Sequence, residues 1–141
     1  MTEIQDPNER NRQVIEEFRA NGGQFGGQQA GVPLLLLTTT GAKSGQARVS
    51  PMIYLPEGDH YYVFAVNNGA PTDPGWYYNL IAHPDVTVEI GTEKFEARAS
   101  VLEDEERESV NRTYVQNMPI LVEMLEKITR KVPFVLLKRK K

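Results

Sequence analysis

The 141-residue sequence contains no cysteine and only two histidines, His60 and His83. The absence of cysteine excludes disulfides, iron–sulfur clusters and thiolate catalysis. The two histidines form no HExxH motif or other ligand spacing, so the sequence predicts no metal site. It also has no GxSxG elbow, and nothing in the spacing of its residues supports a Ser-His-Asp triad. The chain thus lacks side-chain machinery for hydrolysis, and an enzyme built this way would need a cofactor to carry its chemistry.

Long apolar runs and an excess of positive charge are also missing. No apolar run approaches the roughly 18 residues needed to cross a bilayer, and the polar N-terminus predicts no secretory signal and hence a cytoplasmic protein. The net charge of −3, from 16 basic and 19 acidic residues, argues against a nucleic-acid-binding surface. Residues 138–141 are all basic. We expect them to form a solubilising tail, with weak peripheral contact to anionic lipid as the alternative.

The composition that remains is that of one globular domain. Hydrophobic residues make up 40% and charged residues 25% of the chain, and no repeat or linker divides residues 1–141. Asp6, Pro7 and Glu9 predict the start of an N-terminal helix that ends near residue 22. The Gly/Gln-rich segment 22–31 follows no strand and contains no GxGxxG, which excludes a Rossmann fingerprint.

Apolar periodicity predicts six strands and three or four helices. The strands are expected at residues 33–39, 48–55, 60–66, 86–90, 95–101 and 133–137. Beyond the N-terminal helix, helices are expected at residues 76–83, at 103–117 and from Pro119 onward. Turns are expected at residues 56–59 and 91–93. Because strands and helices do not alternate as βαβ units, the simplest architecture is a mainly β fold, an antiparallel sheet closed into a small barrel with helices outside.

A loop rich in hydroxyl groups joins the first two expected strands, with the sequence TTTGAKSG at residues 38–45. Backbone N–H groups in such a Gly-bounded turn can form an anion-binding concavity, to which Lys43 would add a charge and Ser44 a hydroxyl. It is not a P-loop, because Leu36 and Ala42 occupy the glycine positions and a strand follows. From this segment alone, a polar hairpin tip that binds nothing is the favoured explanation, because polar Gly-bounded turns are common.

Two further segments could contribute to a cofactor site. One is Arg48 with Ser50 and Pro51 on the next strand, and the other is residues 67–79, which contain the only tryptophan, Trp76. A flat ring could lie against Trp76 while its phosphate lies near Lys43 and Arg48. From this segment alone, the favoured interpretation is that Trp76 and Tyr77 are core residues at a barrel end. His83 precedes Pro84 at an expected helix end, which favours a capping role over catalysis.

Taken together, these segments resemble the deazaflavin-dependent nitroreductase family, reductases that use coenzyme F-420 on a split β-barrel and include quinone reductases. The resemblance covers about residues 18–137. It is carried by LLLLTTTGAKSGQARVSPMIYL (34–55), NNGAPTDPGWYYNLIAHPDVTVEIG (67–91), ARA (97–99), EER (105–107) and Val132-Pro133. The loop motif TTTGxKSG and the later PGWYYNL, in this order and spacing, are specific.

The resemblance implies a set of cofactor-binding residues and no catalytic side chain. Lys43 and Ser44, with the Ala42 backbone, would bind the phosphate and polyglutamate tail of the cofactor. The adjoining strand would contribute Arg48, Val49, Ser50, Pro51 and Met52. Ala65, Val66 and Asn67 would lie under the deazaflavin ring. The site would be closed by Gly75, Trp76, Tyr77, Tyr78 and Asn79. The cofactor would deliver a hydride to a small electron-poor molecule: a quinone, a nitro compound or an α,β-unsaturated lactone.

The chain departs from the family pattern at two places. Val66-Asn67 stands where many relatives have Ser-Lys or Ser-Asn. Met118, Leu121 and Met124 stand where nitroreducing members have tyrosines, which favours an apolar pocket with broad specificity and a proton taken from water. The alternatives are an FMN-binding split-barrel reductase and a non-catalytic deazaflavin carrier, while a pyridoxamine-phosphate-oxidase-like enzyme would need more basic phosphate ligands. The sequence leaves monomer and homodimer open.

Overall fold

In the computed structural model, which describes residues 7–22, 33–66 and 72–140, six antiparallel strands close into a barrel in the order β1-β2-β3-β6-β5-β4. The expected barrel with outer helices is confirmed. The elements are α1 (Pro7–Ala20), β1 (Leu34–Thr40), β2 (Ala47–Glu57), β3 (His60–Phe64), α2 (Gly75–Ala82), β4 (Asp85–Ile90), β5 (Glu93–Val101), α3 (Asp104–Thr113), a 3₁₀ helix η3 (Val115–Asn117), α4 (Pro119–Glu126) and β6 (Phe134–Arg139).

Alternate side chains of the strands fill the inside of the barrel. In β5, Phe95, Ala97 and Ala99 are buried while their neighbours are exposed, the period of two that places alternate side chains on opposite faces. We call the cluster inside the barrel the inner core. It comprises Leu35, Leu37, Met52, Val63, Leu80, Val86, Val88, Phe95, Ala97, Ala99, Val135 and Leu137.

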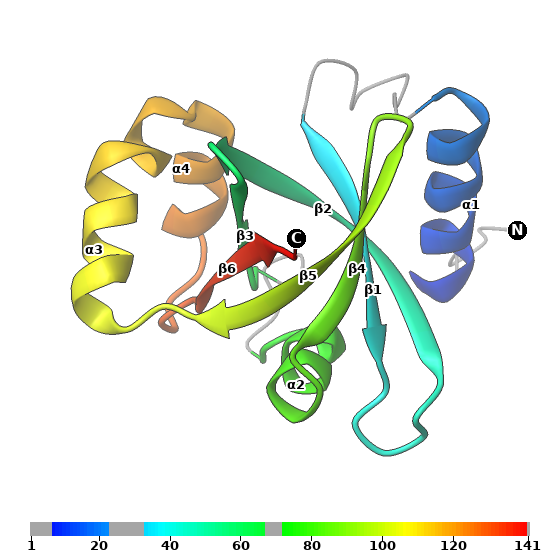
Figure 1. The fold of residues 1–141 in the computed structure, drawn as a ribbon. Coiled ribbons are helices and arrows are strands. Elements are labelled where there is room, and N and C mark those ends of the chain that lie inside the picture. The colour runs from blue at the N-terminus through cyan, green and yellow to red at the C-terminus, as the bar shows by residue number, and fades with distance from the viewer. Residues whose placement is uncertain (1–6, 23–32, 67–71, 141) are drawn as a thin grey trace, which may run out of the picture.

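A second apolar cluster lies outside the barrel, beneath α3, η3 and α4. Figure 1 shows α3 and α4 on one side of the barrel and α1 on the other. We call this cluster the outer core. It comprises Phe64, Ala65, Leu102, Val110, Val115, Leu121, Val132 and Phe134. Phe64 and Phe134 are register partners on β3 and β6, and their rings meet edge to face at 4.8 Å. The late helices are therefore held to the barrel by these two strands.

Strand direction brings separate segments to one end of the barrel. β1 and β3 are both antiparallel to β2, so they run in the same direction and end on the same side. The β1–β2 hairpin and residues 65–66 consequently lie at that end. α2 covers it and inserts Leu80, which is 2% exposed, into the inner core (Figure 1). We call this region the α2 end.

Several element boundaries differ from expectation. Pro56 and Glu57 belong to β2 rather than to a turn, because Glu57 pairs with His60 and the chain reverses over two residues, with Gly58 at φ 59°. β3 ends at Phe64, two residues early. The expected helix 103–117 ends at Thr113 and continues as η3, where a 3₁₀ segment redirects the chain toward Pro119. The Asp6 cap and loop residues 23–31 lie outside the described residues.

The basic end is partly a strand. β6 extends to Arg139 because it pairs with β5 as far as Ala97. Arg139 pairs with Glu93 at 2.6 Å, and the Lys140 ammonium lies 2.8 Å from the Asp85 carboxylate. Lys141 is outside the described residues. Much of the charge expected in a free tail is therefore neutralised on the barrel surface.

Candidate functional site

The β1–β2 hairpin is a tight, internally bonded loop. Gly41 donates its backbone N–H to the Gln46 carbonyl at 2.8 Å, and Gly45 donates to the Gly41 carbonyl at 2.9 Å. The Gln46 N–H donates to Ser44 Oγ at 3.1 Å. Gly45 has φ 71°, a conformation that favours glycine, and a Cβ at Gly41 would lie 2.5 Å from Ser44 Oγ, so the serine hydroxyl would have to leave its bond to Gln46. The hydroxyl of Ser44 is thus already used to shape the loop.

The side chain of Asn79 on α2 holds this loop against the barrel. Its Oδ1 accepts the Ala42 backbone N–H at 3.0 Å, and its Nδ2 donates to Thr39 Oγ1 at 3.2 Å. Thr39 is only 1% exposed, at the end of β1. Asn79 therefore positions the loop, and the Ala42 N–H that the resemblance assigns to the cofactor phosphate is already engaged by Asn79.

Two cations at this end have no partner within the described part of the chain. Lys43 and Arg48 are exposed and make no hydrogen bond or ion pair with the rest of the described chain. Arg48 is the register partner of Thr39. Directly opposed residues share a face of a sheet, so Arg48 lies on the face that leads into the α2 end. An anion approaching the hairpin would meet both charges.

The strand residues next to Arg48 alternate between two faces. Ser50 and Met52 pair with the inward-facing Leu37 and Leu35, whereas Val49 and Pro51 lie on the opposite face. Met52 is 8% exposed and is part of the inner core. Residues 48–52 therefore cannot all present side chains to one ligand.

Arg130, in the connection from α4 to β6, anchors the end of β3. Its Nη2 donates to the carbonyls of Ala65 at 2.8 Å and Val66 at 3.4 Å, and its Nη1 pairs with Asp73 at 2.5 Å. Sequence reasoning missed this residue, because nothing in the local pattern distinguishes it from its exposed neighbour Lys131. Asn67, the third residue predicted under the ring, lies outside the described residues.

The aromatic residues of α2 divide between core and surface. Trp76 and Tyr77 are half-buried and pack against both the inner and the outer core, as the core interpretation of this segment predicts. Burial, followed by the nearby Asp73 carboxylate and Tyr78, raises the pKa of Tyr77. Tyr78 is 52% exposed and meets the Tyr77 ring edge to face at 5.4 Å. Tyr78 is thus the most exposed aromatic side chain of α2. His83 caps this helix through its backbone N–H, which donates to the Asn79 carbonyl.

The predicted substrate residues on and before α4 are mostly packed. Leu121 is 1% exposed in the outer core, Met118 packs beside it, and Met124 is half-buried. A pocket does lie next to α4, but none of these three residues lines it. The three positions therefore do not form a common open surface in this chain.

Two absences hold for the parts of the chain that the structure describes. No group of three or more histidine, cysteine, aspartate or glutamate side chains there could hold a metal ion. Among the described helices, none is long and apolar enough to span a bilayer.

The closed six-stranded barrel, with a cationic hairpin and an aromatic helix at one end, defines the split β-barrel class. A FAD-binding protein from Mesorhizobium loti shares this fold at 19% identity, with a TM-score of 0.51 over 92% of this chain and 89% of the other. The chain belongs to the F420H(2)-dependent quinone reductase family, whose model matches residues 10–139.

Individual relatives agree with this assignment. An F420H(2)-dependent quinone reductase of Mycobacterium tuberculosis is 43% identical over 79 residues, which are 55% of this chain and 53% of the relative. The match thus spans about half the length of the curated relatives. A solved F420-H2 dependent reductase, FDR-A, is 36% identical over 75% of this chain and 94% of its own, with a TM-score of 0.66. A structure described as a domain-swapped dimer is 32% identical over 92% and 95% of the two chains, with a TM-score of 0.67.

Proposed function

We propose that this protein is a reductase that transfers a hydride from reduced coenzyme F-420 to small electron-poor conjugated molecules, with quinones as the first substrate class and nitro compounds and α,β-unsaturated lactones as others. One observation carries the proposal: the hairpin with Lys43, the end of β3 at Ala65 and the aromatic helix α2 meet at one end of the barrel. The chain belongs to a family named for this activity.

The residues at the α2 end fit an anionic cofactor with a flat ring. Lys43 and Arg48 are exposed and have no ion-pair partner among residues 7–22, 33–66 and 72–140, so both charges can attract an anion. The Asp73 carboxylate is neutralised by Arg130, which also binds the backbone at the end of β3. Tyr78 offers an exposed aromatic face. When bound, the cofactor supplies the hydride.

The protein's own contribution is binding and orientation. Asn79 fixes the hairpin relative to α2, and Arg130 fixes the backbone at Ala65 and Val66, so both sides of the site are held by hydrogen bonds. Met118, Leu121 and Met124, which stand where nitroreducing members of the family have tyrosines, carry no hydroxyl that could donate a proton. We therefore propose that the second hydrogen of the product comes from water.

The test is a parallel titration of the purified protein with reduced coenzyme F-420 and with FMN, followed by fluorescence. The proposal requires saturable binding of coenzyme F-420 and its oxidation when a quinone is added, also after exhaustive dialysis against a chelator. Binding of FMN alone would identify the flavin-dependent alternative. Tight binding of coenzyme F-420 with no oxidation by any quinone, nitroaromatic or unsaturated lactone would identify a non-catalytic carrier.

We further propose a homodimer, because a related chain with 32% identity is described as a domain-swapped dimer. Light scattering after size-exclusion chromatography distinguishes it from a monomer. Peripheral contact with anionic membranes is at most weak, since Arg139 and Lys140 are engaged by Glu93 and Asp85.

A further inference from the structure

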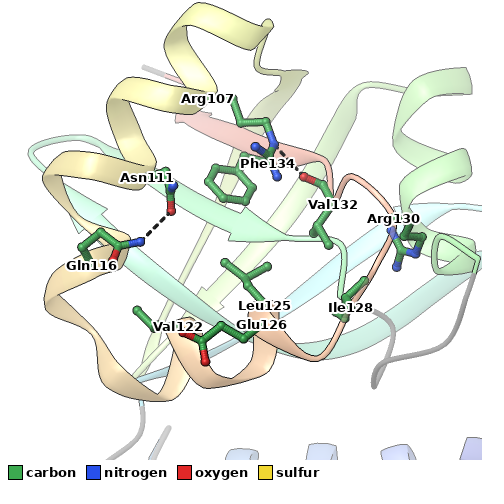
Figure 2. Close-up of a pocket in the computed structure, with 10 residues that line it drawn as sticks. All are labelled: Arg107, Asn111, Gln116, Val122, Leu125, Glu126, Ile128, Arg130, Val132 and Phe134. Carbon is green, nitrogen blue, oxygen red and sulfur yellow. Dashed lines mark hydrogen bonds between the residues drawn. The ribbon is translucent and has the colours of Figure 1, made fainter.

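A pocket of about 300 Å³ lies between α3, α4 and β6, outside the barrel (Figure 2). Its volume is at the lower end of the range for small-molecule sites. Half of its lining residues are apolar, among them Val122, Leu125 and Ile128, while Phe134 also lines it but is almost fully buried. The predicted cofactor residues of the hairpin and α2 are absent from the lining, so this pocket is distinct from the α2 end, although Arg130, which anchors Ala65 and Val66, borders both.

The chemistry of the pocket centres on Arg107. Its Nε donates to the Val132 carbonyl at 2.8 Å, and its guanidinium carbon lies 4.3 Å from the centre of the Phe134 ring (Figure 2). These two contacts fix the plane of the guanidinium. Its two Nη amino groups have no hydrogen-bond or ion-pair partner within residues 7–22, 33–66 and 72–140. Burial lowers the pKa of Arg107, which reflects a charge partly withdrawn from water.

The other polar groups of the pocket do not satisfy this cation. Arg130 is paired with Asp73 and with the carbonyls of residues 65 and 66. Gln116 donates its side-chain amide to Asn111 Oδ1 at 3.2 Å, so these two amides engage each other. Glu126 is exposed, and Figure 2 shows it at the opposite end of the pocket from Arg107. The pocket therefore combines an apolar wall, a fixed cation with free donors and a distant carboxylate.

We propose that this pocket binds a small organic acid, with its carboxylate on the Nη groups of Arg107 and a flat apolar body against Val122, Leu125 and Ile128. A guanidinium fork matches a carboxylate with two parallel, charge-assisted hydrogen bonds. Glu126 at the far end disfavours a second negative charge, so the ligand is a monoanion with its charge at one end.

The probe is 2-naphthoate, with the neutral 2-naphthylmethanol as its matched control. Each is titrated into isotope-labelled protein, and backbone amide shifts are followed by NMR. Naphthoate should shift residues of α3, α4 and residues 130–134, and it should bind about tenfold or more tightly than the alcohol. Reduced coenzyme F-420 should not displace it. Equal affinity for acid and alcohol, shifts confined to the α2 end, or no binding at millimolar concentration would overturn the proposal.

Three variants separate the ligand role of Arg107 from its structural role. Arg107→Lys keeps a positive charge but loses the fork, and should weaken naphthoate binding about tenfold. Val122→Phe fills the pocket without changing Arg107 and should abolish naphthoate binding. The backbone amide shifts that coenzyme F-420 causes at the α2 end should remain as in the wild type. Glu126→Gln removes the carboxylate and should tighten binding. Thermal unfolding confirms that each variant is folded. An unchanged dissociation constant in folded Arg107→Lys and Val122→Phe contradicts the assignment.

Discussion

The side chain of Asn79 accepts the backbone N–H of Ala42 at 3.0 Å, across 37 residues of sequence. The same side chain donates to Thr39, which is buried at the end of β1. One amide therefore joins helix α2 to both the last residues of a barrel strand and the loop that follows it. The position of Lys43, next to Ala42, depends on this bond.

We expect Asn79→Leu, which keeps the approximate size but removes both hydrogen bonds, to lower the free energy of unfolding by about 1–3 kcal/mol. It should also weaken binding of coenzyme F-420, because the hairpin loses its attachment to α2. Thr39→Val is the matched control, since it removes only one of the two bonds and should cost less. Chemical denaturation and fluorescence titration measure the two effects. A stable Asn79→Leu protein with unchanged cofactor affinity would contradict the positioning role.

Lys43→Ala should weaken cofactor binding by about ten- to a hundredfold, because it removes a charge-assisted contact to the phosphate or tail. Raising the salt concentration should weaken the wild type more than the variant. The control is Lys138→Ala, which removes an exposed lysine paired in register with His60 at the opposite end of the barrel. Equal dissociation constants for Lys43→Ala and wild type would remove Lys43 from the site.

Arg130→Gln should lower stability by about 2 kcal/mol, since it leaves the half-buried Asp73 without its ion-pair partner; the two side chains are only 17% and 22% exposed. The double variant Arg130→Gln with Asp73→Asn removes the stranded charge. We expect it to recover part of the stability but not the cofactor affinity, because the carbonyls of Ala65 and Val66 remain unanchored. Recovery of both stability and cofactor affinity in the double variant would show that Arg130 acts only by neutralising Asp73, and not by anchoring the carbonyls.

Substitution by tyrosine should affect protein stability at Leu121 but not at Met124. Leu121→Tyr places a larger side chain and a hydroxyl into a position that is 1% exposed, so it should cost about 1–3 kcal/mol of stability. Met124 is half-buried, and Met124→Tyr should fold normally. If the late helix faces the substrate, Met124→Tyr changes the relative rates with quinones and nitroaromatics and leaves cofactor affinity unaltered. A full substrate panel with reduced coenzyme F-420 tests this.

Tyr62 should make stability fall at alkaline pH. Burial, followed by its 2.8 Å hydrogen bond to Glu57, raises the pKa of Tyr62 to about 12. The unfolded tyrosine loses its proton near pH 10, so deprotonation favours the unfolded chain between pH 10 and about 12, and the contribution is intact below pH 10. Tyr62→Phe should reduce the pH dependence of unfolding in this window. Identical slopes in wild type and Tyr62→Phe would exclude this origin.

The sequence by itself determined the barrel and its strands. Alternating apolar residues such as Phe95, Ala97 and Ala99 specify a strand with one buried face, and this choice depends only on neighbours in the chain. Gly41 and Gly45 likewise mark a loop whose shape is set within a few residues. The motif around Lys43 and the segment from Gly75 to Asn79 identified the family for the same reason, because they are short and contiguous.

Only the tertiary structure decided how these segments use their side chains. Asn79 reaches Ala42 across 37 residues and Arg130 reaches Ala65 across 65, and no local pattern encodes such partners. The same holds for Leu121, whose burial depends on the docking of α4 against β3 and β6, and for the free guanidinium edge of Arg107 in its pocket. The local sequence pattern shows whether a side chain is apolar or charged. Which residue that side chain contacts depends on which strands and helices pack together, because burial and hydrogen bonding are properties of the folded chain.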